Sequence, residues 1–319
     1  MDSTITLKTR NKAIIDDCEA AALRFRPVTN SDIRLLTGYF FKYPSRSCDF
    51  SVGGVLMWTD YFEYEISETM DTLFLMGTNP ANGEKIFYHP CGPIDYNVFL
   101  CLVNTYCRQN NFKYIILDPY ESNGESCSDT DMKISVHIDE WKEYLYDIDR
   151  FVTFAGRKME KKRNHLNFFI NNYSPFTVSV INDSDIAELI AFTLAFSTVH
   201  SDNKLAVYEC TQVIDVLRNY NDYPFFGIVI RVDNEIVGYS FGEKTGDTFF
   251  VHVEKGNIGF RGIYQALASR LAYEVSSRFK DVRYLNREED MGDESLKRSK
   301  ESYHPSLYIN KVVQNRRFL

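Results

Sequence analysis

The order of elements in the second half of the chain limits the folds that it can adopt more than any other feature of the sequence. Three β-rich runs, at 224–232, 235–241 and 247–253, follow one another through two tight turns, a pattern typical of an antiparallel meander. A helical pattern at 262–278 and a short strand at 281–285 come next. A connection of this length joins parallel strands, so we expect strands 247–253 and 281–285 to be parallel neighbours.

The first half of the chain repeats this order, although the two halves share no detectable sequence identity. The second half also has a strand at 175–181, helices at 183–200, 205–220 and 290–302, and a last strand at 306–313. The first half has a strand at 23–28, helices at 30–43 and 53–62, three strands ending at His89, a helix at 94–109, and strands at 113–117 and 131–138. We therefore predict an α+β fold (α/β mixed sheet) with two tandem domains, 1–150 and 151–319, each with its own sheet. A helix at 156–172 would connect or abut them. The element order of each half resembles the GNAT acyltransferase fold.

Composition excludes several classes of protein. The net charge of −8 argues against a dedicated nucleic-acid coat, and the excess of acidic residues lies in the first half. The seven cysteines are odd in number and form no CxxC pair, which indicates free thiols in a reducing compartment. The N-terminus has no apolar signal segment, and no run reaches the roughly 18 apolar residues of a membrane span. We expect a cytoplasmic protein without a transmembrane segment.

The stretch that follows the predicted strand 281–285 holds the residues most suited to chemistry. Three acids, Glu288, Glu289 and Asp290, would lie at the carboxyl end of the sheet, where α/β folds bind ligands. A carboxylate there could accept a proton from an attacking amine, and Tyr303 could return one to a leaving group. We predict proton transfer by Tyr303 and one of these acids, without choosing between the acids. At least one acid should face a pocket shared with Tyr303 or Arg261.

Other residues of this stretch are predicted to bind substrate: Asn286, Arg287, Lys300 and His304. A purely structural interpretation remains open for the charges. Acids at the start of a helix and cations near its end suit the helix dipole without any chemistry. That interpretation explains neither the Asn286–Arg287 pair nor the Tyr303–His304–Pro305 terminus.

The turn before helix 262–278 is the predicted donor site. Its glycines, Gly256, Gly259 and Gly262, would let the backbone approach a pyrophosphate at the helix N-terminus, beside Arg261 and Tyr264. The glycines are three residues apart, which departs from the acetyl-CoA signature, so plain turn glycines remain the alternative. The equivalent turn of the first half, 89–94, contains two prolines that lack backbone donors, so no phosphate site is expected there.

A cluster of cations begins the helix predicted at 156–172. The cluster contains Arg157 and the predicted anion-binding residues Lys158, Lys161, Lys162 and Arg163. Cations at a helix N-terminus oppose the helix dipole, so they are expected to face an anion. That anion is either the acidic first half of the chain or a ligand such as an RNA backbone or a phospholipid headgroup.

Metal sites are not predicted. The six histidines show no HExxH motif or other metal-ligand spacing. His252 lies inside a predicted strand, and we expect it to be a hydrogen-bonded core residue.

Several of these segments carry a family resemblance. "FRGIYQAL", "LNREEDMG" and "LKRSKESYHP" resemble signatures of the DUF2156 family, which is similar to the C-terminal domain of phosphatidylglycerol lysyltransferase. "KKRNHLNFF" and "GGVLMWTDYF" fit the same family, so the resemblance covers about residues 25–313. It implies two tandem GNAT-like domains related to the Fem-type transferases that use aminoacyl-tRNA. The lysyltransferases carry a long transmembrane region before this domain, and none is expected in this chain.

The resemblance and the residues together predict a transferase that moves an activated acyl or aminoacyl group to an amine or hydroxyl. Aminoacyl-tRNA or acyl-CoA would be the donor, and a small molecule or lipid headgroup the acceptor. Direct transfer requires positioning, a proton acceptor and an oxyanion donor but no metal. The alternative is a non-catalytic module that binds a small ligand or a protein on a degenerate tandem GNAT fold.

Overall fold

The computed structural model describes residues 22–122 and 135–314, and its strands form one mixed sheet. The first half contains β1 (Arg26–Pro27), α2 (Ile33–Lys42), α3 (Val52–Met57), α4 (Thr59–Phe62), β2 (Glu65–Thr69), β3 (Thr72–Thr78), β4 (Lys85–Tyr88), α5 (Tyr96–Asn110), β5 (Tyr114–Ser122), β6 (Ser135–His137) and β7 (Glu143–Asp147). The second half contains α6 (Ile148–Thr153), α7 (Glu160–Asn172), β8 (Phe176–Val180), α8 (Ile186–Val199), α9 (Lys204–Arg218), β9 (Phe225–Val232), β10 (Glu235–Thr245), β11 (Thr248–Gly256), α10 (Ile263–Arg278), β12 (Tyr284–Glu289), α11 (Glu294–Glu301) and β13 (Leu307–Gln314).

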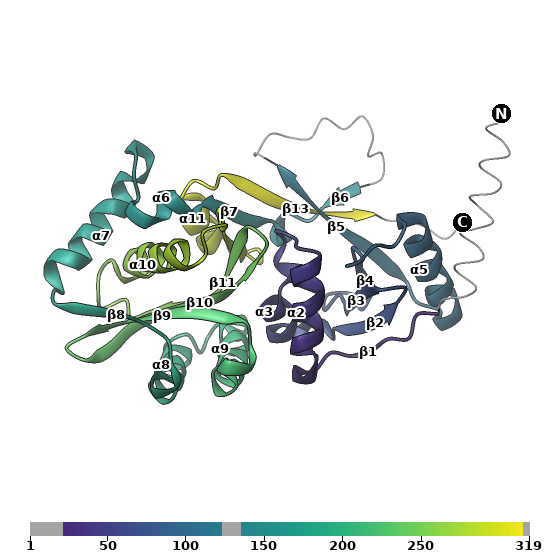
Figure 1. The fold of residues 1–319 in the computed structure, drawn as a ribbon, viewed down its shortest axis with the longest axis horizontal. Helices are drawn as coiled ribbons and strands as arrows, with labels where there is room; N and C mark the ends of the chain where they lie inside the picture. Colours follow the sequence, from purple (N-terminus) through teal and green to yellow (C-terminus); the bar gives the residue numbers. More distant parts are fainter. Residues whose placement is uncertain (1–21, 123–134, 315–319) are drawn as a thin grey trace.

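The repeated element order is confirmed as far as the fifth strand of each half, and with it the predicted α+β fold of two GNAT-like halves. After that strand the described first half has β6 and the unpredicted β7, whereas the second half has α11 and β13. In each half four strands pair antiparallel in sequence order, β1 to β4 and β8 to β11. The fourth strand then pairs in parallel with the fifth, through crossover helix α5 in the first half and α10 in the second. In Figure 1, α7 and α10 cover one face of strands β8–β11, and α8 and α9 cover the other.

The expectation of two separate sheets is wrong. The strand order is β1-β2-β3-β4-β5-β13-β7-β12-β11-β10-β9-β8, with β6 paired to β13. The last strand of each half therefore joins the other half, because β7 pairs with β12 while β13 pairs with β5 and with β7. This exchange removes two sheet edges that would otherwise expose unpaired backbone groups. The division at residue 150 stays a prediction.

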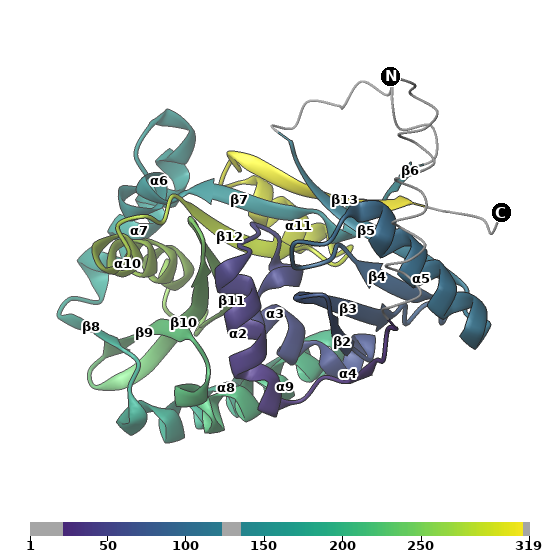
Figure 2. The same ribbon diagram turned by 45° about the vertical axis from the view of Figure 1, so that its right-hand side comes forward.

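The two halves also share an apolar core. Leu36 of α2, Val55 of α3, Val213 of α9 and Phe241 of β10 are fully buried in one cluster that draws on both halves. Figure 2 shows α2 and α3 lying between the strands of the two halves. Two further clusters lie under α5 and between α6, α7, α10 and the sheet. The shared core and the continuous sheet hold the cleft described below in a fixed geometry.

The predicted boundaries of the last elements need correction. Strand β12 does not end at Leu285 but continues to Glu289, with an irregular register between Asn286 and Glu289. Glu288 adopts a positive φ of 57° in this irregular segment. Helix α11 begins only at Glu294, because Asp293 caps it by accepting from the amides of Ser295 and Leu296. The three acids therefore belong to the end of a strand and its turn, and not to a helix.

In the part of the chain that the structure describes, no helix is long and apolar enough to span a membrane.

Candidate functional site

Strands β11 and β12 enclose the main cleft. They pair in parallel over three residues only, from Thr248–Tyr284 to Phe250–Asn286, and beyond this point they diverge. The cleft that opens there has a volume of about 940 Å³. All three predicted acids line it, together with Arg287, Lys300 and Tyr264. Trp58 of the first half and Asn203 of the second half also line it, so both halves build the site.

Glu288 is held by a buried histidine. Its Oε1 lies 2.6 Å from Nδ1 of His252, whose Nε2 lies 2.9 Å from Oε1 of Glu243. Burial opposes protonation of this imidazole, but the charge of Glu288 and hydrogen bonds to both carboxylates outweigh it and raise the pKa of His252 to about 9. The expectation that His252 is a hydrogen-bonded buried residue is confirmed, and the structure also places it in the cleft wall.

The first half of the chain supports this histidine. The amide of Gly53, in α3, donates to Oε1 of Glu243 at 2.6 Å. A Cβ on Gly53 would lie 2.5 Å from Cδ2 of His252, so only glycine allows this approach. The imidazolium with its two carboxylates is therefore fixed from β10, β11, β12 and α3 together.

Glu289 belongs to a different buried cluster, formed around Lys311 of β13. The ammonium of Lys311 contacts Oδ1 of Asp49 at 2.9 Å, Oε1 of Glu143 at 3.2 Å and also Oε1 of Glu289. Glu143 is fully buried and accepts from the amide of Cys48 at 2.8 Å and from Nδ2 of Asn286 at 2.5 Å. Burial raises the pKa of Glu143 to about 7, although Lys311 opposes this shift. Predicted substrate ligand Asn286 thus holds this cluster instead of lining the cleft.

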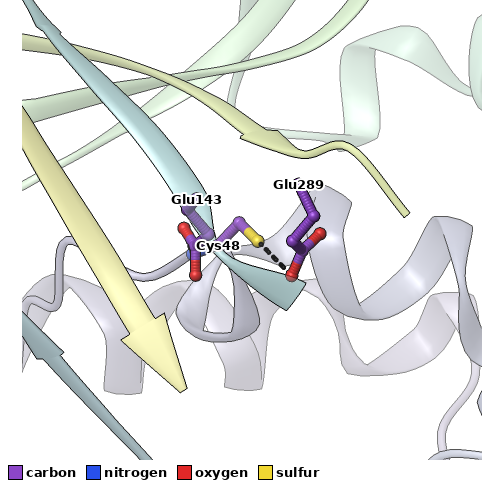
Figure 3. A group of neighbouring side chains, drawn as sticks. All are labelled: Cys48, Glu143 and Glu289. Atoms are coloured by element: carbon purple, nitrogen blue, oxygen red, sulfur yellow. Dashed lines mark hydrogen bonds between the residues drawn. The ribbon is translucent and has the colours of Figure 1, made fainter. Parts of the chain in front are cut away.

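The same cluster contains the side chains best arranged for a metal ion. Ligand atoms of Cys48, Glu143 and Glu289 lie within 4.8 Å of one another, and Sγ of Cys48 lies 3.5 Å from Oε1 of Glu289 (Figure 3). The ammonium of Lys311 already bonds to both glutamates, so a cation would compete with it for the same oxygens. Burial raises the pKa of the Cys48 thiol well above its ordinary value, which disfavours a thiolate ligand. We assign no metal to this site.

Arg287 lines the cleft, and Tyr303 lies behind it. Nη2 of Arg287 bonds to Oε1 of Glu254 at 2.6 Å, and its guanidinium carbon lies 5.0 Å from the centre of the Tyr303 ring. Tyr303 is buried and accepts from Nε2 of Gln265 at 2.8 Å. Burial raises the pKa of Tyr303. The ring stacks on Phe151 with centroids 5.3 Å apart, which explains why it lies in the core.

The expected pocket shared by the acids with Tyr303 or Arg261 is therefore not found. The acids line the cleft, but neither of the other two residues does. Arg261 lies instead over the ring of Phe168, 4.5 Å from its centre. The proton-transfer role of Tyr303 stays a prediction.

Lys300 and Asp290 shape the end of β12. Nζ of Lys300 donates to the carbonyls of Arg287 at 2.6 Å, Glu288 at 3.2 Å and also Glu289, which fixes the irregular segment. Burial lowers the pKa of Lys300 to about 8. Asp290 accepts from Oη of Tyr144 at 2.5 Å and from the amide of Gly292 at 2.9 Å. The polar atoms of both side chains already bond to other groups of the protein. Glu288 is therefore the acid best placed for chemistry.

The glycines of the predicted donor turn pack against protein. Gly262 has a φ of 93°, and a Cβ there would lie 2.2 Å from the carbonyl oxygen of His165 in α7. Gly256 similarly packs against Ile263, and the amide of Gly259 bonds to Asn257. Helix α7 thus covers the N-terminus of α10, where a pyrophosphate would lie in the predicted arrangement. Of the predicted donor residues in this turn and the start of α10, Tyr264 alone lines the cleft.

A second pocket of about 510 Å³ lies along α7, and we call it the basic pocket. Its lining consists of Arg157, Lys158, Glu160, Lys161, Lys162, His165, Gln265, Ser302 and His304. Arg163, predicted to belong to this set, instead donates to the carbonyls of Phe154 at 2.6 Å and Gly156 at 3.1 Å and closes the preceding turn. Among the described residues, none of the lining lysines forms an ion pair with the first half. The charge attraction between the halves that we considered is therefore not seen here.

Several site residues were missed in the sequence: His252, Glu243, Glu254, Glu143, Asp49 and Lys311. Five of them lie within strands whose neighbours are mostly apolar, and the sixth, Asp49, lies in a short 3₁₀ turn before α3. Charged residues are almost never fully buried without a partner, so charges in apolar runs were a usable signal.

Comparisons with known proteins agree with this fold. A crystal structure of a Bacteroides thetaiotaomicron conserved protein of unknown function is 23% identical, with a TM-score of 0.80, covering 92% of this chain and 100% of that one. The C-terminal DUF2156 domain of an Agrobacterium fabrum protein described as a lysylphosphatidylglycerol synthetase is 14% identical, with a TM-score of 0.60, covering 90% and 92%. L-PGS from Bacillus licheniformis is 13% identical, with a TM-score of 0.57, covering 89% and 93%.

The sequence itself also matches a known protein and a family. An uncharacterized protein of Mycoplasmoides gallisepticum is 26% identical over 171 residues, or 53% of this chain. The matched region spans 54% of that protein, about half of its length. Residues 40–312 match the family described as phosphatidylglycerol lysyltransferase, C-terminal. With most of its length matched, the chain belongs to the phosphatidylglycerol lysyltransferase C-terminal (DUF2156) family.

Proposed function

We propose that this chain is an acyl or aminoacyl transferase whose reaction takes place in the cleft between β11 and β12. The observation that carries the proposal is the carboxylate of Glu288, which lines the cleft and is oriented by His252 at 2.6 Å. A general base must be held in the substrate cavity with a defined orientation, and this residue meets both requirements.

In the proposed reaction the nitrogen of an amine acceptor attacks the carbonyl carbon of the donor. Glu288 takes the proton that the nitrogen loses as the carbon–nitrogen bond forms. The bond to the leaving group then breaks, and the leaving oxygen receives that proton. A hydroxyl acceptor would react in the same way. His252 remains protonated throughout and keeps the carboxylate in place, with Glu243 balancing its charge.

We favour aminoacyl-tRNA over acyl-CoA as the donor. Helix α7 covers the N-terminus of α10, which leaves no space at Gly262 for a pyrophosphate. The basic pocket offers cations for an RNA backbone, and the family resemblance to the Fem-type transferases supports the same donor. The names of the relatives favour a phosphatidylglycerol headgroup as the acceptor.

The test is transfer of a labelled amino acid from charged tRNA to phosphatidylglycerol vesicles or to hydroxylamine, a small amine, with acetyl-CoA as the competing donor. Replacing the base, Glu288→Gln, is expected to lower kcat by about 10²–10⁴-fold. The matched control is Glu294→Gln, which changes a more exposed acid of the same cleft wall. Failure of the folded protein to transfer from any donor would favour the binding-module alternative.

A further inference from the structure

Lys162 and Arg287 approach one buried aromatic ring from two different cavities. Lys162 lines the basic pocket, and its Nζ lies 3.7 Å from the centre of the Tyr303 ring. Arg287 lines the cleft, and its guanidinium carbon lies 5.0 Å from the same centre. Two cations are thus brought together at a partly dehydrated place, although like charges repel there.

Carboxylates do not balance these two cations. Glu254 pairs with Arg287 at 2.6 Å, whereas among the described residues Lys162 has no ion-pair partner. Burial, followed by repulsion from Arg287, lowers the pKa of Lys162 to about 8. Lys162 is therefore unpaired among the described residues while it is protonated, and an additional negative charge beside it would be favourable.

Arg287 also has an unused hydrogen-bond donor. Its Nη1 is buried and has no hydrogen-bond partner among the residues that the structure describes. Nη2 is held by Glu254, so the guanidinium is fixed, and the Tyr303 side chain lies beside it without a hydrogen bond to Nη1. A buried charged donor without an acceptor is costly, and native proteins seldom keep one without a use.

We propose that Arg287 and Lys162 bind the oxyanion that forms on the carbonyl oxygen of the donor during transfer. The inference rests on the proposed function. When the acceptor nitrogen bonds to the carbonyl carbon, the π electron pair moves to this oxygen and gives it a full negative charge. The pair returns when the bond between the acyl carbon and the tRNA oxygen breaks. The two cations interact with this charge only while it exists, so they stabilise the transition state more than the substrate.

The effect of pH on activity through Lys162 must be distinguished from its effect through neighbouring titratable groups. The groups that face Lys162 are Arg287 and Glu254 from the sheet, Tyr303 and His304 after α11, Gln265 of α10, and Lys158, Lys161 and His165 of its own helix. Lys300 also has a pKa lowered to about 8, but its ammonium bonds to three backbone carbonyls. Substitution of Lys162 therefore has to be compared with the wild type across the same pH range.

The experiment measures kcat and KM for transfer of radiolabelled lysine from tRNA to hydroxylamine. Arg287→Met is expected to lower kcat by about 10²–10³-fold with little change in KM, and Arg287→Lys should recover part of the loss. Lys162→Met should lower kcat and remove a fall in activity above about pH 8, while Lys162→Arg should move that fall to higher pH. The matched control is Arg298→Met on α11, whose guanidinium bonds to the carbonyl of Glu294 at 3.1 Å and lines neither cavity.

A second measurement separates this role from a structural one. In the double variant Glu254→Gln/Arg287→Met the buried pair and the unpaired donor are removed together. If Arg287 serves catalysis, this variant should keep a Tm at or above the wild-type value while activity is lost. A large fall in Tm, or unchanged kcat in Arg287→Met, would overturn the inference while leaving the proposed function standing. A wild-type protein that transfers nothing would overturn both.

Discussion

Glu288 and Glu289 are adjacent in β12, yet their carboxylates bond to separate buried clusters. Oε1 of Glu288 lies 2.6 Å from His252, whereas Oε1 of Glu289 contacts the ammonium of Lys311. The positive φ of Glu288 and the irregular register of the strand separate the two side chains. One acid is therefore available to the cleft, and the other joins β12 to β13. The two residues should respond to mutation in different ways.

The first prediction concerns the cluster around Lys311. Lys311→Met leaves Asp49, Glu143 and Glu289 buried together without a cation, so we expect a loss of about 3–5 kcal/mol in the free energy of unfolding. Urea denaturation measures this loss. Lys280→Met, at an exposed lysine, serves as the control and should change stability by less than about 0.5 kcal/mol. Equal stability of the two variants would show that the cluster does not need its ammonium.

The second prediction concerns the pH dependence of stability at His252. Its pKa of about 9 in the folded protein exceeds the ordinary value of 6.5. A group with a raised folded-state pKa contributes its full stabilisation below the unfolded-state pKa, and this contribution is lost as pH rises through the folded-state pKa. Stability should fall between about pH 6.5 and 9 by roughly 3 kcal/mol, as measured by unfolding at each pH. His252→Gln should flatten this dependence, and an unchanged slope in that variant would exclude His252 as its source.

The third prediction compares two glycines in helices. Gly53→Ala places a methyl group 2.5 Å from His252, so it should cost about 1–3 kcal/mol of stability and displace the imidazole. Gly38→Ala in α2 meets no atom within 4 Å and should be neutral or stabilising by about 0.5–1 kcal/mol. Thermal unfolding of both variants checks the contrast. If Gly53→Ala were as stable as Gly38→Ala, the close packing of α3 on His252 would not hold.

The fourth prediction concerns RNA binding in the basic pocket. The variant Lys158→Glu/Lys161→Glu should weaken tRNA binding and make its salt dependence shallower, because each phosphate contact contributes a log–log slope of about −0.7 to −0.9. The protein should remain folded, since charge changes at exposed positions cost little stability. Filter binding across a salt series measures the effect, with Lys280→Glu as the control for reversing one exposed lysine outside the basic pocket. Wild-type affinity in the double variant would exclude these lysines from an RNA interface.

The acids of the candidate site could be located from the sequence, but their partners could not. The position of Glu288–Asp290 beside the parallel strand pair follows from strand and helix patterns, which are local. That Glu288 bonds to His252 depends on how β11 and β12 diverge, and that Glu289 bonds to Lys311 depends on β13. For the turn glycines, the local conformation could be predicted but the surroundings could not. Gly262 looked suited to a phosphate, and its positive φ is real, but α7 fills the space beside it.

Local chemistry along the chain accounts for the element order and the crossover helices, because caps, turns and apolar periodicity act between residues a few positions apart. It does not account for the exchange of β7 and β13 between the halves. A strand has the same alternation of side chains whichever neighbour it pairs with, so its sequence does not specify which strand it pairs with. The pairing was decided by contacts between distant segments, including the apolar core under α2, α3 and α9 and the ammonium of Lys311 among carboxylates from three other elements.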